Sequence, residues 1–321
     1  MTLYRSAIAL LFLLNAAAAS PDETPEPPAW ATALSSAQGT EEEFVNAFRA
    51  EEFARLGQMR ELGAEIDMLA RGGKPEQVAA KKAQAQQVVD EISAAYAWAL
   101  GKYPENARLL TYHGEFLYDV LGKQEEAIVL WNRSLTFDGK LSLTYNDLSL
   151  HYAHIGQYKL SLSHLDKALD LDGKNPDFQY NLAQFYLVYG PQTEELRGWN
   201  KKKVYKEGMK ASKRASALSP DDFELVKDYA VNYFAGENFG VEVNWKDAAK
   251  AWQEARAKAR NKTDIFYAWL NEARSWIRAG KDSNAMAALN EALKIFPDSE
   301  VAQKLLGELE LKQEKASKKG K

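Results

Sequence analysis

Residues 143–174 read LTYNDLSLHYAHIGQYKLSLSHLDKALDLDGK and contain the most regular unit of a repeat that decides the fold. A tyrosine followed four residues later by a glycine recurs at a spacing of 34 residues: Tyr118 with Gly122, Tyr152 with Gly156, and Tyr186 with Gly190. From residue 40 onward, apolar residues recur every three or four positions among strong helix formers, and strand patterns are missing. Such a period is typical of stacked helical hairpins.

The period continues with two insertions. Tyr233 and Trp276 have the same surroundings at intervals of 47 and 43 residues. Small residues fill the eighth, twentieth and twenty-seventh positions of each unit, with Glu115 as the only exception, and the twenty-fourth position is mostly large. Small residues at facing positions allow two helix axes to approach closely, so we expect two helices per unit.

These columns resemble the tetratricopeptide repeat (TPR) family. The resemblance is clearest in 143–174 and in FYAWLNEARSWIRAGKDSNAMAALNEALKIFPDS, residues 266–299. It implies an all-α fold, an α-α superhelix (TPR-like solenoid) of about five hairpins with an added hairpin at the N-terminus and a capping helix at the C-terminus. The expected segments are an N-terminal hairpin at 40–107, repeats at 108–141, 142–175, 176–222, 223–265 and 266–299, and a capping helix at 300–316.

The two ends of the chain have different compositions. Residues 1–19 carry Arg5 ahead of a short apolar run and end in small residues around Ala17 and Ala19. This pattern predicts a cleaved signal peptide, with a retained anchor as the alternative. Residues 20–39 are expected to be a disordered linker and 317–321 a basic tail. No other stretch is apolar enough to span a membrane. We therefore expect an exported protein, periplasmic or secreted, without disulfides because the chain has no cysteine.

The TPR resemblance implies that the first helix of each unit lines a concave groove for a protein or peptide partner. The groove positions that we select are Leu109, Tyr112, Phe116, Leu143, Asn146, Leu150, His154, Tyr180, Gln184 and Leu187. The Lys and Asn pair with which some family members hold a peptide carboxylate is missing at these positions. The alternative is that the N-terminal hairpin or the 20–39 segment covers this face.

A basic insertion at 191–214 is the second candidate site. It carries eight Lys or Arg against three Glu, and its exposed group is expected to include Arg197, Lys201, Lys202 and Lys203. It could contact an acidic partner, a glycan or an anionic envelope surface. The alternative without a binding role is a solvated helix, or a contact within the chain between this insertion and the acidic N-terminal region 21–70. The net charge of −4 argues against a nucleic-acid binder.

Three of the four histidines, His151, His154 and His164, lie within fourteen residues. In the repeat register His151 and His164 occupy positions that other units fill with mostly apolar or small residues, so we interpret them as packing residues and expect no metal ion and no cofactor. Catalytic motifs such as a P-loop or a G-x-S-x-G elbow are missing. The sequence therefore predicts an interaction module or assembly scaffold, not an enzyme. The alternative function is an envelope- or glycan-binding accessory protein that acts through 191–214.

Overall fold

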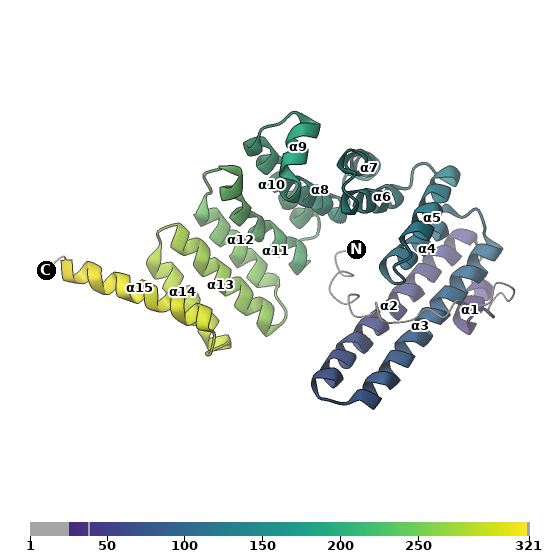
Figure 1. Ribbon diagram of the computed structural model, residues 1–321, viewed down its shortest axis with the longest axis horizontal. Helices are drawn as coiled ribbons and strands as arrows, with labels where there is room; N and C mark the ends of the chain where they lie inside the picture. Colours follow the sequence, from purple (N-terminus) through teal and green to yellow (C-terminus); the bar gives the residue numbers. More distant parts are fainter. Residues whose placement is uncertain (1–25, 38, 320–321) are drawn as a thin grey trace. The chain divides into compact units, whose positions relative to one another are not determined.

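The computed structural model describes residues 26–37 and 39–319, and these residues contain helices and no strand (Figure 1). They divide into two compact units, one ending at His151 and the other starting at Tyr152. The first unit holds α1 (Ala29–Ala37), α2 (Glu41–Arg71), α3 (Pro75–Lys102), α4 (Ala107–Asp119), α5 (Gln124–Phe137) and most of α6 (Ser142–His154). The division falls inside α6 and not between two predicted repeats.

The second unit continues from the end of α6. It holds α7 (Tyr158–Leu171), α8 (Pro176–Val188), α9 (Gly190–Arg197), α10 (Lys201–Leu218), α11 (Phe223–Asn232), the 3-10 helix η2 (Tyr233–Phe239), α12 (Trp245–Lys258), α13 (Lys262–Arg278), α14 (Asp282–Ile295) and α15 (Glu300–Lys319). The all-α prediction, with a pair of helices per repeat, is confirmed.

The N-terminal hairpin has clear local causes. Thr40 and Glu43 form a capping box at the start of α2, in which the Thr40 hydroxyl accepts from the Glu43 amide and the Glu43 carboxylate accepts from the Thr40 amide. Pro75 is the first residue of α3, where its missing N–H costs nothing. The two helices of this hairpin run from Glu41 to Lys102, inside the segment 40–107.

Glycines and small residues shape the hairpins of the repeats. Gly122 and Gly156 turn the chain after α4 and α6 with φ of 66° and 76°, a left-handed conformation that favours glycine. The predicted small residues at the twentieth position are all buried: Ala127, Ser161, Gly208, Ala248 and Ala285. Because a larger side chain would hold the paired helices apart, these positions fix the spacing within each hairpin.

The two insertions form structure between the paired helices of the third and fourth repeats. The first contains α9, which begins at Gly190, so this glycine starts a helix where Gly122 and Gly156 make a turn. The second contains η2 and the segment 240–244 before α12. Both pack near α10, and Gly190 is buried against the ring of Phe239, which a Cβ on this residue would meet at 2.9 Å.

The two ends of the described chain are more helical than the sequence predicts. The linker prediction is wrong for Ala29–Ala37, which form α1: Ala31 is fully buried and the Trp30 ring lies 5.3 Å from that of Phe48. The basic tail is also corrected, because α15 continues to Lys319. The predicted signal peptide, 1–19, lies outside the described residues, as do 20–25, 320 and 321.

Candidate functional site

In the first repeat, the predicted groove residues do not line an open face. Leu109 and Phe116 are 0% and 2% exposed, and Tyr112 is 9% exposed. They belong to one core cluster with apolar residues of α2 and α3, including Phe48 and Tyr96. The alternative of a covered face therefore holds here, because the N-terminal hairpin supplies the apolar surface on which these side chains pack.

Charged groups reinforce this cover. The Arg49 guanidinium on α2 forms ion pairs with Glu52 at 2.6 Å and with Glu115 on α4. It also lies 4.1 Å above the ring of Tyr112. Burial alone would lower the pKa of Arg49, but the adjacent carboxylates of Glu115 and Glu52 raise it above its ordinary value. Tyr112 thus binds a residue of its own chain.

The predicted groove residues of α6 differ from one another in exposure. Asn146 is 1% exposed, and its amide is 3.4 Å from the Asp147 carboxylate. Leu143 packs partly buried against the core cluster of the first unit. Leu150 is half-buried and His154 is exposed. Asn146 is therefore a core residue, and the exposed His154 belongs to the second unit.

In the second unit, Tyr180, Gln184 and Leu187 on α8 are half-buried. Gln184 donates a hydrogen bond of 2.7 Å to Asp228 on α11. Leu187 packs against α10, since a Cβ on Gly208 would meet its side chain at 2.8 Å. Two of the three predicted residues thus join neighbouring helices.

Further along the second unit, a cavity of about 380 Å³ opens between η2, α13 and α15. Its lining combines apolar side chains with two arginines: Phe234, Asn271, Arg274, Ile277, Arg278 and Leu305. Phe234 and Ile277 stand at the twelfth position of their repeats, as the groove residue Leu187 does. Arg274 and Arg278 stand at the ninth and thirteenth, as Gln184 and His154 do. The cavity is therefore built mainly from the positions assigned to the groove. We call it the groove cavity.

Internal contacts hold the arginines of the groove cavity in place. Arg278 donates to Glu237 at 2.5 Å and lies 5.4 Å above the ring of Phe234. Arg274 donates to Asn271 at 3.1 Å. A guanidinium fixed beside an apolar wall can donate to the carboxylate of a ligand whose apolar side chain fills the cavity.

The predicted basic group splits in the structure. Arg197 is half-buried and pairs with Asp166 at 2.5 Å, and it also donates to the Tyr186 hydroxyl at 3.2 Å. Lys203 lies 4.6 Å above the ring of Trp199. Lys201 and Lys202 are exposed, and Lys202 lines a cavity. Arg197 is thus engaged inside the fold.

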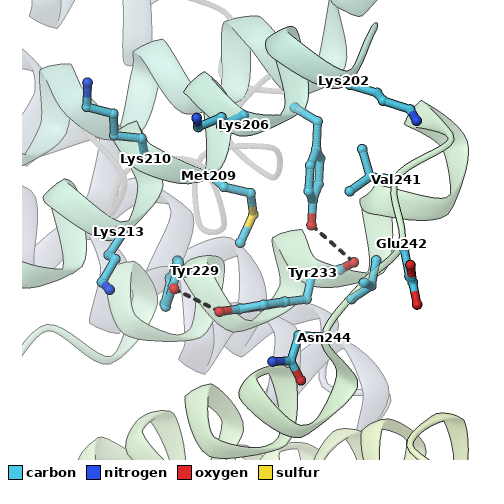
Figure 2. Close-up of a pocket in the computed structure, with 12 residues that line it drawn as sticks. Lys202, Lys206, Met209, Lys210, Lys213, Tyr229, Tyr233, Val241, Glu242 and Asn244 are labelled. Atoms are coloured by element: carbon cyan, nitrogen blue, oxygen red, sulfur yellow. Dashed lines mark hydrogen bonds between the residues drawn. The ribbon is translucent and has the colours of Figure 1, made fainter.

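Lys202 lines a second cavity, of about 560 Å³, between α10, α11 and the segment 241–244 (Figure 2). We call it the lysine cavity. Four lysines of α10 line it: Lys202, Lys206, Lys210 and Lys213. The remaining lining is largely aromatic and apolar: Tyr205, Met209, Tyr229, Tyr233, Val241, Glu242, Val243 and Asn244. It is a basic, amphipathic pocket large enough for one bulky side chain and its neighbours.

Two hydrogen bonds order the tyrosines of the lysine cavity. The hydroxyls of Tyr229 and Tyr233 are 2.8 Å apart, and the Tyr205 hydroxyl donates to the Tyr233 carbonyl at 3.5 Å (Figure 2). Burial and the neighbouring Tyr229 raise the pKa of Tyr205 to about 12. The phenol of Tyr205 therefore stays neutral at physiological pH and keeps its proton for a hydrogen bond.

The clustered histidines take part in ring packing. His151 is buried, with its ring edge-on to Tyr118 at 5.9 Å, and His164 stacks on Tyr152 at 5.3 Å. Burial lowers the pKa of both. The fourth histidine, His113, stacks on Tyr96 at 4.7 Å. Across residues 26–37 and 39–319, no group of three or more His, Asp or Glu could hold a metal ion, and no helix is long and apolar enough to cross a membrane.

Comparison with known proteins identifies the class. Residues 244–300, which hold α12, α13 and α14, match the family model of the tetratricopeptide repeat. The chain therefore contains this repeat, and its paired helices have the tetratricopeptide-repeat fold. Among curated proteins, none matches the sequence.

Solved TPR structures are similar to the chain at low identity. YrrB, described as a TPR protein with an unusual peptide-binding site, is 18% identical, covers 65% of this chain and 96% of its own, and gives a TM-score of 0.47. The C-terminal part of a TPR repeat-containing protein from Cytophaga hutchinsonii is 15% identical, covers 81% and 99% of the two chains, and gives a TM-score of 0.49.

Sequence reasoning missed most residues of both cavities, although signals for them exist. Applying the groove positions to the fourth and fifth repeats selects Phe234, Arg274, Ile277 and Arg278 directly. The lysines of α10 are spaced by four, four and three residues, which places them on one helix face. The facing wall at 241–244 has no such signal, because it comes from an insertion.

Proposed function

We propose that the chain is an exported scaffold that holds a segment of a partner protein in the groove cavity. The single observation that carries this proposal is the groove cavity itself: it lies at groove positions of the fourth and fifth repeats, where the face is not covered as it is in the first repeat. A partner segment gains affinity there by burying apolar area, because the helices that form the walls are already in place.

The lining defines the partner segment that fits. Phe234, Ile277 and Leu305 offer apolar surface for one large side chain. Arg278 is paired with Glu237, whereas Arg274 donates to the neutral side chain of Asn271, so Arg274 favours a carboxylate beside it. We expect a short peptide with an apolar anchor and a neighbouring Asp or Glu, bound with a dissociation constant in the micromolar range, about −8 kcal/mol.

Selection from a randomised peptide library tests this preference. The full chain is immobilised, enriched peptides are labelled, and their affinity is measured by fluorescence anisotropy. We expect Arg274→Glu to weaken binding at least about tenfold, because it puts a like charge beside the ligand carboxylate. Arg260→Glu, an exposed residue between α12 and α13, is the matched control and should change affinity less than about twofold. Equal affinity of the two variants would contradict the site.

Export is a separate part of the proposal and needs its own test. It is supported by the apolar run and the small residues that end the 1–19 segment. Mass spectrometry of the protein isolated from its native cells should show a chain that starts near Ser20. A native chain that still begins at the first residues, found with the cytosolic fraction, contradicts export and leaves the peptide-binding test unaffected.

A further inference from the structure

We propose that the lysine cavity is a second docking site, which binds an acidic segment of a partner protein. The segment would place an apolar or aromatic side chain in the cavity and its carboxylates along the lysines of α10. This site goes beyond the groove cavity, because the two cavities share no lining residue.

The charges of the lining select an anion. Four lysines and one glutamate, Glu242, line the cavity. All four lysines are exposed, and the ammonium of Lys210 lies 3.7 Å from the carboxylate of Glu207 on the same helix. A lysine ammonium is a compact charge on a flexible side chain and can donate to a carboxylate that approaches from many directions. This suits a run of Asp and Glu whose spacing varies.

The interior of the cavity selects an apolar group. Tyr205 is 7% exposed, and Met209 and Val243 are half-buried, so the apolar lining is recessed. Gly236 allows the insertion to close on this wall, because a Cβ there would meet Val243 at 2.5 Å and the Tyr205 ring at 3.0 Å. The wall is therefore packed before any ligand arrives, which lowers the entropy lost on binding.

The length of the lysine row fits a peptide. Lys202 and Lys213 are eleven residues apart on one helix, or about 16 Å along its axis. An extended segment of about five residues covers this distance. Two or three carboxylates can therefore reach the row while one side chain between them enters the cavity.

A peptide suits the site better than a membrane surface. Proteins that lie on membranes insert projecting apolar side chains between the lipids. No residue of the lysine cavity is among the exposed large hydrophobic residues of the described chain; the nearest along α10 is Leu218. The apolar groups here face inward and the amines face outward, which is the arrangement for an acidic chain with an apolar anchor.

The experiment uses the full chain and a labelled ten-residue peptide of Asp and Glu with one central Phe. We expect binding at low salt, about 50 mM, that weakens at least about fivefold at about 300 mM, because exposed charges are screened. Changing the Phe to Ala should weaken binding at least about fivefold, since the apolar anchor is lost. A peptide with Gln and Asn for the acids should not bind.

Matched variants locate the binding. Lys206→Glu/Lys210→Glu should weaken binding at least about tenfold, because both residues line the cavity. Lys201→Glu/Lys203→Glu makes the same change in net charge on the same helix, at residues outside the lining, and should change affinity less than about threefold. All four side chains are exposed, so both variants should keep the wild-type circular dichroism and melting temperature.

The remaining outcomes overturn the proposal. Equal weakening by both double variants means that only the overall charge matters, and no effect of the Phe-to-Ala peptide means that the cavity stays empty. Phosphatidylglycerol vesicles and a sulfated oligosaccharide are tested alongside. If one of them binds through Lys206 and Lys210 while the peptide does not, the site serves an anionic surface or glycan. Because this peptide also fits the groove cavity, Lys206→Glu/Lys210→Glu is measured in the wild-type chain and in the Arg274→Glu chain. The loss that it causes should persist in the Arg274→Glu chain, which separates this test from that of the groove cavity.

Discussion

Gln184 of α8 donates a hydrogen bond of 2.7 Å to the carboxylate of Asp228 on α11. The same carboxylate accepts from Ser212 on α10 at 2.9 Å and from Asn232 at 2.8 Å. One half-buried acid thus joins three helices of the second unit through neutral donors. Burial raises the pKa of Asp228 to about 6, against the opposing effect of these hydrogen bonds.

This raised pKa predicts a pH-dependent stability. Between pH 4 and pH 6 the folded chain binds the Asp228 proton more tightly than the unfolded chain does. The free energy of unfolding is therefore highest when the pH lies below the pKa that Asp228 has in the unfolded chain. It falls by on the order of 2 to 3 kcal/mol as the pH rises through about 6, the pKa in the folded chain. Asp228→Asn should remove this change, and urea unfolding at pH 4, 5, 6 and 7 would measure it. Asp170→Asn, on an exposed part of α7, should keep the wild-type profile.

The ion pairs of Arg49 link the N-terminal hairpin to the first repeat, and their contribution to stability can be measured. Arg49→Met removes the cation between Glu52 and Glu115, both of which are less than 9% exposed, and leaves two buried carboxylates without it. We expect a loss of about 3 to 5 kcal/mol in unfolding free energy. Lys81→Met breaks the pair with Glu65, whose side chains are 32% and 46% exposed, and should cost at most about 1 kcal/mol. Similar losses in both variants would show that burial of the Arg49 pair is unimportant.

Gly114 in the first repeat has no room for a larger side chain. A Cβ there would overlap the indole of Trp131, coming within 2.6 Å of its Cδ1, while the indole N–H donates to the Thr111 carbonyl at 3.2 Å. Gly114→Ala should therefore destabilise the chain by about 1 to 3 kcal/mol in thermal or urea unfolding. Gly57→Ala, inside α2 with its nearest contact at 3.7 Å, should instead stabilise it by up to about 1 kcal/mol. A neutral Gly114→Ala would mean that the indole moves aside freely.

The C-terminal helix predicts a capping effect that truncation can measure. α15 covers α13 and α14 with Ala302 and Leu309, which are 0% and 5% exposed, and with the partly buried Leu305 and Leu306. Deleting residues 298–321 should cost about 3 to 5 kcal/mol, the burial of two or three leucines. Deleting only 311–321 removes the exposed residues 311–315 and 317 and the pair of Lys312 with Asp282, and should cost less than about 1 kcal/mol. Equal stability of the two truncated chains would contradict capping.

The helical pairs were predictable because the repeat is a local pattern. Small residues such as Ala127 and Ala285, and the proline that starts α3, report packing and capping within one hairpin. The sequence does not decide whether this face of the first repeat is an open groove or is covered, because Leu109, Tyr112 and Phe116 suit a groove and a core equally well. Only the position of α2 and α3 decides between them.

The site depended on contacts that the period does not encode. The basic insertion was recognised by its composition, but the face of α10 that lines a cavity was not selected, and Arg197 was included although it pairs with Asp166. The segment 29–37 was missed for a similar reason. It is short and rich in alanine and serine, so it is fixed by Trp30 and Ala31 packing on α2, not by its own helical pattern.

One wall of the lysine cavity is made by residues that the 34-residue period does not contain, since Val241 to Asn244 follow η2 in the second insertion. The columns that stack the helices and the loop that shapes this cavity are thus encoded in separate stretches of the chain. A substitution in the loop can alter what the cavity accepts while the helical frame stays as it is. At the proposed docking site, the residues that would set ligand preference are therefore separate from those that stack the repeats.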